Sequence, residues 1–243
     1  MRVQFVGSGD AFGSGGRFQT CIWVQAGDFT VLVDCGASSL IAMRRLGLDP
    51  GEVDAVLLSH LHGDHFGGVP FLVLDAQFSR RVRPLTVAGP PGVEDRVVSC
   101  MENLFPGSST ARRRFETQFL EIPGDLTPVR VGPTTVSGAE VIHASGGPPL
   151  ALRVEVDGKT LAYSGDTGWS DALVTVAREA DLFVCEAYFY DKKIPYHLDY
   201  ATLREHLPGL KARRVVLTHM SIDMLERLPL GVQAAHDGLA LDV

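Results

Sequence analysis

Three histidines and one aspartate occupy six consecutive positions of this chain, between two apolar stretches. They are His60, His62, Asp64 and His65. The apolar run 56–58 before them predicts a short buried strand, and the helical spacing of apolar residues in 69–73 predicts a helix after them. The cluster therefore belongs on a strand-to-helix loop, which favours an α/β fold with a site at the end of a strand.

Such a loop can direct His60 and His62 at one metal ion and then offer Asp64 and His65 to a second ion. Imidazole nitrogens together with a carboxylate oxygen suit zinc, with manganese or iron as alternatives in the half that is richer in oxygen. The competing interpretation is a polar loop with surface histidines. One histidine would fit it, but three with an aspartate at this spacing favour a metal site.

Length and composition narrow the class of protein. The chain has 243 residues, of which 45% are hydrophobic, and no linker divides it, so we expect residues 1–243 to form a single domain. No apolar run has membrane-spanning length and no signal peptide is evident, so we expect a cytoplasmic protein. The net charge of −7 argues against a general nucleic-acid binder. Four scattered cysteines without a Cys-x-x-Cys pair predict no disulfide framework.

The order of predicted elements supports the α/β class. In the first half, helices at about 39–46, 66–79 and 92–104 alternate with strands at 54–59 and 85–88, after a hairpin at 21–34. The chain then changes to short strands between 115 and 164 and ends with a strand at 181–186, a helix at 200–207 and a strand at 214–217. The second half thus repeats a sheet followed by helices. The glycine-rich segment 7–16 lacks the phosphate-binding signatures, so we interpret it as a turn.

The histidine-rich motif is similar to the hallmark of a known protein family. His60, His62, Asp64 and His65 match, residue for residue, the His-x-His-x-Asp-His hallmark of the metallo-β-lactamase superfamily, which the chain resembles. The resemblance implies a four-layer αββα sandwich of two mixed β-sheets flanked by helices. It also places Asp34 in a turn below the metal loop, in a structural role.

The same resemblance implies three further metal ligands. His143 would complete the first set with His60 and His62. Asp166, in a Ser-Gly-Asp-Thr segment, would bridge two divalent ions, and His219, in Leu-Thr-His, would join the second set. Taken alone, His143 is an ordinary histidine and Asp166 a turn cap; the resemblance is what makes them ligands.

Within the superfamily the chain is most similar to the RNase Z-like branch, through Glu186, His197 and the segment 217–221. RNase Z carries a long arm that grips transfer RNA between the positions that align with His143 and Asp166, and here only 22 residues separate them. We therefore expect a smaller substrate, a cyclic or linear phosphodiester or a short RNA. Arg112, Arg113 and Arg114 are interpreted as a solvated charge run, with substrate-phosphate binding as the alternative.

The resemblance implies hydrolysis at two divalent metal ions, for which the ligands favour zinc, where a bridging hydroxide attacks phosphorus. Asp64 would orient or deprotonate the nucleophilic water, and His197 would steady the transition state or protonate the leaving oxygen. A solvent-facing loop histidine is the competing interpretation of His197. Close relatives are commonly dimers, so the resemblance also implies that the chain can form a homodimer.

Three alternatives stay open from the sequence. The same centre hydrolyses thioesters, lactones, lactams and sulfate esters in relatives, although Asp166 in place of a cysteine speaks against the lactamases. A redox di-iron module is disfavoured because His62 stands where that group carries glutamate. A non-catalytic metal scaffold is disfavoured because every expected ligand is present.

Overall fold

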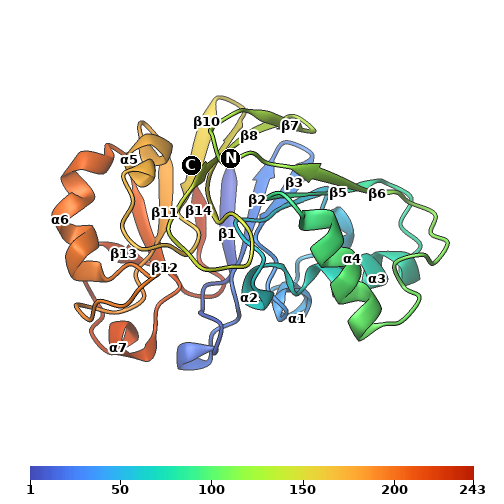
Figure 1. Cartoon of the computed structure of the whole chain (residues 1–243), viewed down its shortest axis with the longest axis horizontal. Coiled ribbons are helices and arrows are strands. Elements are labelled where there is room, and N and C mark those ends of the chain that lie inside the picture. Colours follow the sequence, from blue (N-terminus) through green and yellow to red (C-terminus); the bar gives the residue numbers. More distant parts are fainter.

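Each half of the chain forms a mixed β-sheet, apart from the last strand, which joins the sheet of the first half, and the two sheets pack face to face between two layers of helices (Figure 1). The computed structural model describes all residues from Met1 to Val243. This is the predicted four-layer αββα sandwich, so the fold class is confirmed.

The first sheet has seven strands, of which four are joined as antiparallel neighbours and the rest continue in parallel. In spatial order they are β14 (Ala240–Asp242), β1 (Arg2–Gly7), β2 (Cys21–Ala26), β3 (Phe29–Val33), β4 (Ala55–Leu57), β5 (Leu85–Gly89) and β6 (Thr117–Glu121). Strand β4 is fully buried, because parallel strands covered on both faces must be apolar throughout. The metal-loop sequence follows this strand.

The second sheet has the same number of strands and the same division into parallel and antiparallel pairs. In spatial order they are β13 (Gln233–Ala234), β12 (Val215–Thr218), β11 (Leu182–Glu186), β10 (Lys159–Tyr163), β9 (Leu150–Val156), β8 (Thr134–Glu140) and β7 (Val129–Val131). A tight hairpin at Asp157 and Gly158 joins β9 to β10, as predicted.

Seven helices cover the outer faces of the sheets (Figure 1). They are α1 (Ser39–Arg45), α2 (Gly63–Phe66), α3 (Val69–Phe78) and α4 (Val93–Leu104) on the first sheet, and α5 (Ala172–Ala177), α6 (Tyr200–Leu210) and α7 (Ile222–Leu225) on the second. Short 3-10 helices span Ser14–Gly16 and Pro50–Glu52. No helix has both the length and the apolar character needed to cross a membrane.

Three apolar clusters correspond to the three interfaces between these layers. The central one, with Phe5, Leu57 and Tyr163 fully buried, lies between the two sheets. The other two bury the inward faces of the helices against the outer face of each sheet. Each sheet is therefore covered on both sides, which holds the loops at the strand ends in fixed positions.

The structure departs from the predicted division into halves at two strands. Strand β6 was expected to begin the second sheet but pairs in parallel with β5, and β14 crosses back to pair with β1. Local sequence gives no information on either partner, because strand pairing depends on distant residues. The two ends of the chain consequently lie side by side, with the Met1 nitrogen 3.4 Å from the Val243 carbonyl oxygen.

Candidate metal centre

The histidine-rich loop after β4 is held by the turn that follows β3. The Cys35 amide donates to the His65 carbonyl oxygen at 2.6 Å, and the Gly68 amide donates to the Cys35 carbonyl oxygen at 2.8 Å. The backbones approach so closely that a Cβ on Gly36 would lie 2.3 Å from the Asp64 carbonyl oxygen. Only glycine permits this approach. The turn therefore fixes which way the side chains after β4 point.

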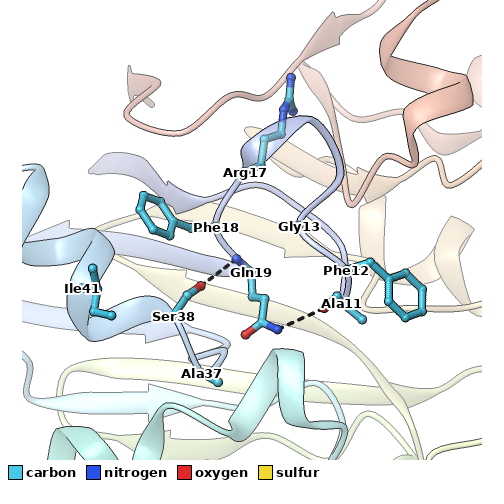
Figure 2. A pocket seen from close by; sticks show the side chains of 9 residues that line it. All are labelled: Ala11, Phe12, Gly13, Arg17, Phe18, Gln19, Ala37, Ser38 and Ile41. Carbon is cyan, nitrogen blue, oxygen red and sulfur yellow. Dashed lines mark hydrogen bonds between the residues drawn. The ribbon is translucent and has the colours of Figure 1, made fainter.

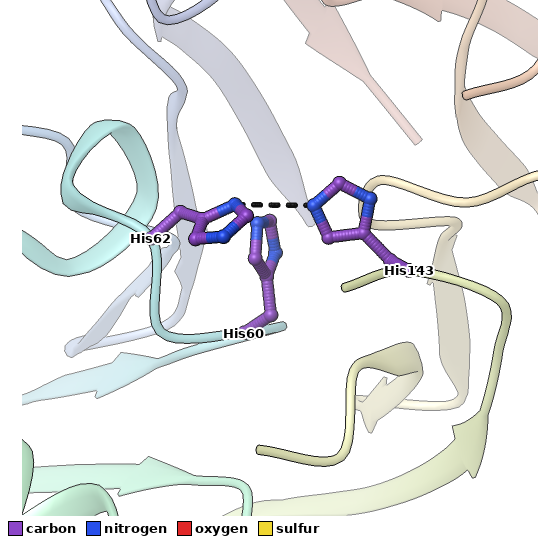
Figure 3. Close-up of side chains that lie close together, drawn as sticks. All are labelled: His60, His62 and His143. Atoms are coloured by element: carbon purple, nitrogen blue, oxygen red, sulfur yellow. Dashed lines mark hydrogen bonds between the residues drawn. The ribbon is translucent and has the colours of Figure 1, made fainter. Parts of the chain in front are cut away.

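A first group of possible ligands consists of three histidines whose rings converge from two different segments (Figure 3). His60 and His62 come from the loop after β4, whereas His143 lies just beyond β8. The predicted strand included His143, but β8 ends at Glu140. His143 Nε2 lies 3.1 Å from His62 Nδ1, and the ligand atoms of all three lie within 4.8 Å of one another.

A second group of possible ligands lies deeper and combines two carboxylates with two histidines: Asp64, His65, Asp166 and His219. Asp64 Oδ2 lies 3.2 Å from His65 Nε2 and 3.3 Å from His219 Nε2. Asp166 Oδ2 lies 3.3 Å from His65 Nε2 and 3.9 Å from His60 Nε2 of the first group. Asp166 thus stands between the two groups, in the position expected of a bridging carboxylate.

The polar atoms of the site fit a cation. His60 Nε2, His65 Nε2 and Asp166 Oδ1 are buried without any hydrogen-bond partner, which is rare for polar groups in a folded interior. Nitrogen and carboxylate oxygen atoms at such spacing are the donor set that zinc accepts. The residues present therefore suit divalent metal ions, and the sequence motif is brought together with the distant residues that the resemblance implied.

Neighbouring groups hold the ring nitrogens of three histidines that face away from the centre. The backbone carbonyl of Tyr196 lies 2.9 Å from His143 Nδ1, and Ser59 Oγ lies 3.0 Å from His60 Nδ1. Asp34 Oδ2 lies 2.7 Å from His65 Nδ1, and the same carboxylate accepts hydrogen bonds from the amide and hydroxyl of Ser59. Each contact occupies Nδ1 and leaves Nε2 facing the centre, the arrangement usual for metal-binding histidines. Asp34 is therefore structural, as predicted, but through a direct contact that the sequence did not indicate.

His197 follows the exposed residues Pro195 and Tyr196, but its side chain is only 22% exposed and lies beside the second group. Its Nδ1 is 3.0 Å from Oε2 of Glu186, the fully buried last residue of β11, and 3.9 Å from Asp166 Oδ2. Atoms of Asp166, Glu186, His197 and His219 also lie within 4.8 Å of one another, so this group is a third candidate set of ligands. Because Glu186 occupies Nδ1, the free ring nitrogen of His197 is Nε2.

Charge pairing perturbs the acid–base properties of the site. Burial alone would raise the pKa of Asp64, but His65 and His219 lower it well below its usual range. Burial lowers the pKa of His60, and the neighbouring His65 lowers it further. Burial would also lower the pKa of His197, but the hydrogen bond and charge of Glu186 raise it. Perturbed groups of this kind, gathered in one hollow, are typical of functional sites.

A cavity of about 190 Å³ opens above these side chains. It is lined by Ala11, Phe12, His62, Asp64, His143, Asp166, Tyr188, His197 and His219. Sequence analysis missed Phe12 and Tyr188. The glycine-rich segment after β1 was the available signal for Phe12, but it was interpreted as a turn without a role. Tyr188 follows the predicted strand at 181–186 and carried no motif of its own.

Other residues singled out from the sequence lie elsewhere. Arg112 and Arg114 are exposed and do not line the cavity, while Arg113 donates a hydrogen bond to the Ser109 carbonyl oxygen. All four cysteines are free thiols, and three of them are buried. Burial raises the pKa of the Cys35 thiol to about 12, so it is an inert core residue at neutral pH.

Comparison with known proteins agrees with the fold. The sequence model of one family, described as anti-Pycsar protein Apyc1, matches residues 1–234. The anti-Pycsar protein Apyc1 of Paenibacillus sp. (strain J14) is 28% identical over 236 residues, covering 92% of this chain and 91% of the relative. A ribonuclease Z of Halorubrum lacusprofundi is 29% identical over 269 residues, covering 91% and 86%. The crystal structure of human tRNase Z, short form, superposes with a TM-score of 0.80 at 22% identity, covering 100% and 99% of the two chains.

The two sheets, the histidine-rich loop after β4 and these relatives define a metal-dependent hydrolase of the metallo-β-lactamase superfamily, in its RNase Z-like branch. Within that class the match over residues 1–234 is decisive. The chain belongs to the anti-Pycsar protein Apyc1 family.

Proposed function

We propose that the protein is a binuclear metal-dependent phosphodiesterase that hydrolyses a small cyclic or linear phosphodiester. The observation that carries this proposal is the pair of ligand groups joined by Asp166 at the floor of one cavity. In our assignment His60, His62 and His143 hold the first ion, Asp64, His65 and His219 hold the second, and Asp166 is shared. Two bound zinc ions would activate a water nucleophile at neutral pH and neutralise charge on the phosphoryl oxygens.

The chain's own groups supply the proton transfers in this proposal. Asp64 lines the cavity, and its Oδ2 lies 3.2 Å from His65 Nε2 and 3.3 Å from His219 Nε2, so its carboxylate can orient the attacking water and accept a proton. His197 has a raised pKa, which favours the protonated ring, and Glu186 holds Nδ1 so that Nε2 is free toward the cavity. Because His197 lines the cavity, we assign its Nε2 the donation of a proton to the leaving oxygen.

The size of the cavity supports a small substrate. At about 190 Å³ it lies below the roughly 300 Å³ at which pockets for drug-sized ligands begin. The β9–β10 hairpin occupies the stretch in which RNase Z carries its arm, and no long insertion extends from it. The names of the relatives, ribonuclease Z and anti-Pycsar protein, are consistent with phosphodiester chemistry. A short RNA end is the larger alternative in the same class.

The test is hydrolysis of bis(4-nitrophenyl) phosphate by protein of measured metal content, run beside a chromogenic lactam and a thioester. We expect turnover of the diester alone, loss of that turnover with a chelator, and recovery on addition of zinc. Cyclic nucleotides and a short RNA then define the natural class. Cleavage of the lactam or thioester with no action on any diester would contradict the proposal.

A further inference from the structure

Phe12 is the most exposed large apolar side chain of the molecule, at 84%, although it sits in a tightly ordered loop. The fully buried carboxylate of Asp10 accepts the Phe12 amide at 3.2 Å and the Ser14 amide at 2.9 Å through Oδ1, and the Ser14 hydroxyl at 2.7 Å through Oδ2. Gln19 Nε2 donates to the Ala11 carbonyl oxygen at 3.2 Å. These hydrogen bonds hold the backbone of the loop that presents the Phe12 ring to solvent.

The ring stands at the mouth of the metal cavity. Ala11 and Phe12 line that cavity together with His62, His143 and Tyr188. Phe12 also lines the neighbouring groove of Phe18, Ser38 and Ile41, and Figure 2 shows its ring at the far end of that groove, pointing away from Phe18 and Ile41. The exposed phenyl therefore belongs to the rim of the candidate active site.

The cavity is too small to enclose a whole nucleotide, so a phosphodiester at its floor would leave the rest of the substrate at its mouth. An exposed aromatic ring on a hydrogen-bonded loop in that place offers a stacking platform, and every nucleobase has a face that can stack on it. We propose that Phe12 binds the base of a nucleotide substrate by stacking and so selects nucleoside phosphodiesters over those without a base. This inference rests on the proposed phosphodiesterase function.

The experiment compares Phe12→Ala and Phe12→Trp with the native enzyme on three substrates. These are a pyrimidine and a purine 3′,5′-cyclic nucleotide and the cyclic phosphate of methyl riboside, which has no base. We expect Phe12→Ala to raise KM for both nucleotides about tenfold with little change in kcat, and Phe12→Trp to restore the native KM. The preference for nucleotides over the base-free phosphate should shrink by the same factor.

Phe78→Ala is the matched control. Phe78 is 82% exposed at the end of α3 and does not line the cavity, so its removal should leave all three KM values unchanged. A Phe12→Ala enzyme with native KM for the nucleotides, or with an equal rise for the base-free phosphate, would overturn the inference while leaving the phosphodiesterase proposal intact.

Inhibition by product analogues tests base binding by Phe12 without requiring turnover of a cyclic nucleotide. A nucleoside monophosphate should inhibit native protein more strongly than ribose 5-phosphate does, and Phe12→Ala should remove the difference. This readout applies to whichever chromogenic substrate the enzyme cleaves. Sedimentation velocity of Phe12→Ala supplies the last criterion: if the variant changes the oligomeric state and not the inhibition, the ring serves a contact between two copies and the inference fails.

Discussion

Asp64 belongs to the second ligand group and lines the cavity, so its carboxylate serves both metal binding and chemistry in our proposal. Its Oδ2 lies within 3.3 Å of the Nε2 atoms of His65 and His219, which belong to the same ligand group. We predict that Asp64→Ala lowers kcat at least a hundredfold, because a proton acceptor and a ligand are lost together. Steady-state kinetics and a thermal melt measure this, with exposed Asp28→Ala as control. Turnover near the native value would remove Asp64 from the mechanism.

A variant of His197 tests whether this residue donates a proton or binds a metal ion. If its role is proton donation, His197→Ala lowers turnover about a hundredfold and leaves two ions per chain, because the seven proposed ligands are untouched. Elemental analysis after dialysis measures the ions, and kcat on the diester measures the role. A content of one ion per chain would instead assign His197 to the third ligand group, with Asp166, Glu186 and His219.

Among individual residues, the sequence predicted those site residues that belong to a motif. His60, His62, Asp64 and His65 adjoin one another, and the matched segments of the family supplied His143, Asp166 and His219. Contacts made by residues without a motif could not be predicted. Asp34 reaches His65 across 31 positions, and Phe12 lines the cavity only because of how its loop folds back.

Among the elements, the joint between the β3 turn and the metal loop controls the geometry of the site. We predict that Gly36→Ala lowers the free energy of unfolding by about 1–3 kcal/mol, because its new Cβ would lie 2.3 Å from the Asp64 carbonyl oxygen. It should also weaken metal affinity, since the loop must move. Urea unfolding and a zinc titration measure the two effects.

Gly63→Ala is the matched control in the same loop. A Cβ there would meet no heavy atom within 4 Å, and Gly63 begins α2, where alanine is the better helix former. We expect a change in stability below about 0.5 kcal/mol. Equal destabilisation by the two variants would show that the close approach at Gly36 does not govern the loop.

Elements with a clear period were predicted well, as for the helices 93–104 and 200–210 and the strand 85–89. The pairing of strands within the sheets was not predicted. Strand β6 has a half-buried pattern that suits either sheet, and β14 has three residues, too few to indicate a partner. Which sheet receives them depends on the packing of the whole chain.

Across the whole molecule, both halves contribute to each ligand group. That residues 1–243 unfold as a single domain stays a prediction, and the shared site makes it testable. We expect one calorimetric transition whose midpoint rises on addition of zinc, because ions bound between the halves stabilise both together. Removing zinc with a chelator should lower the midpoint without splitting the transition.

Two resolved transitions, or a zinc-dependent shift confined to one of them, would show that the halves unfold separately. The His60→Ala, His62→Ala double variant provides the control, since it removes first-half ligands without touching the inter-sheet core. Its midpoint should respond less to zinc than that of the native protein.

Because the ligands lie in distant segments, they are synthesised at different times during translation. His60 to His65 leave the ribosome early, but His219 is made 154 residues after His65. At bacterial or eukaryotic rates of synthesis that interval lasts about 8 to 30 s. Throughout it the second ligand group lacks one of its histidines. Loading of the second ion therefore has to await a nearly finished polypeptide, so a chain that stalls before His219 is made lacks a complete second site.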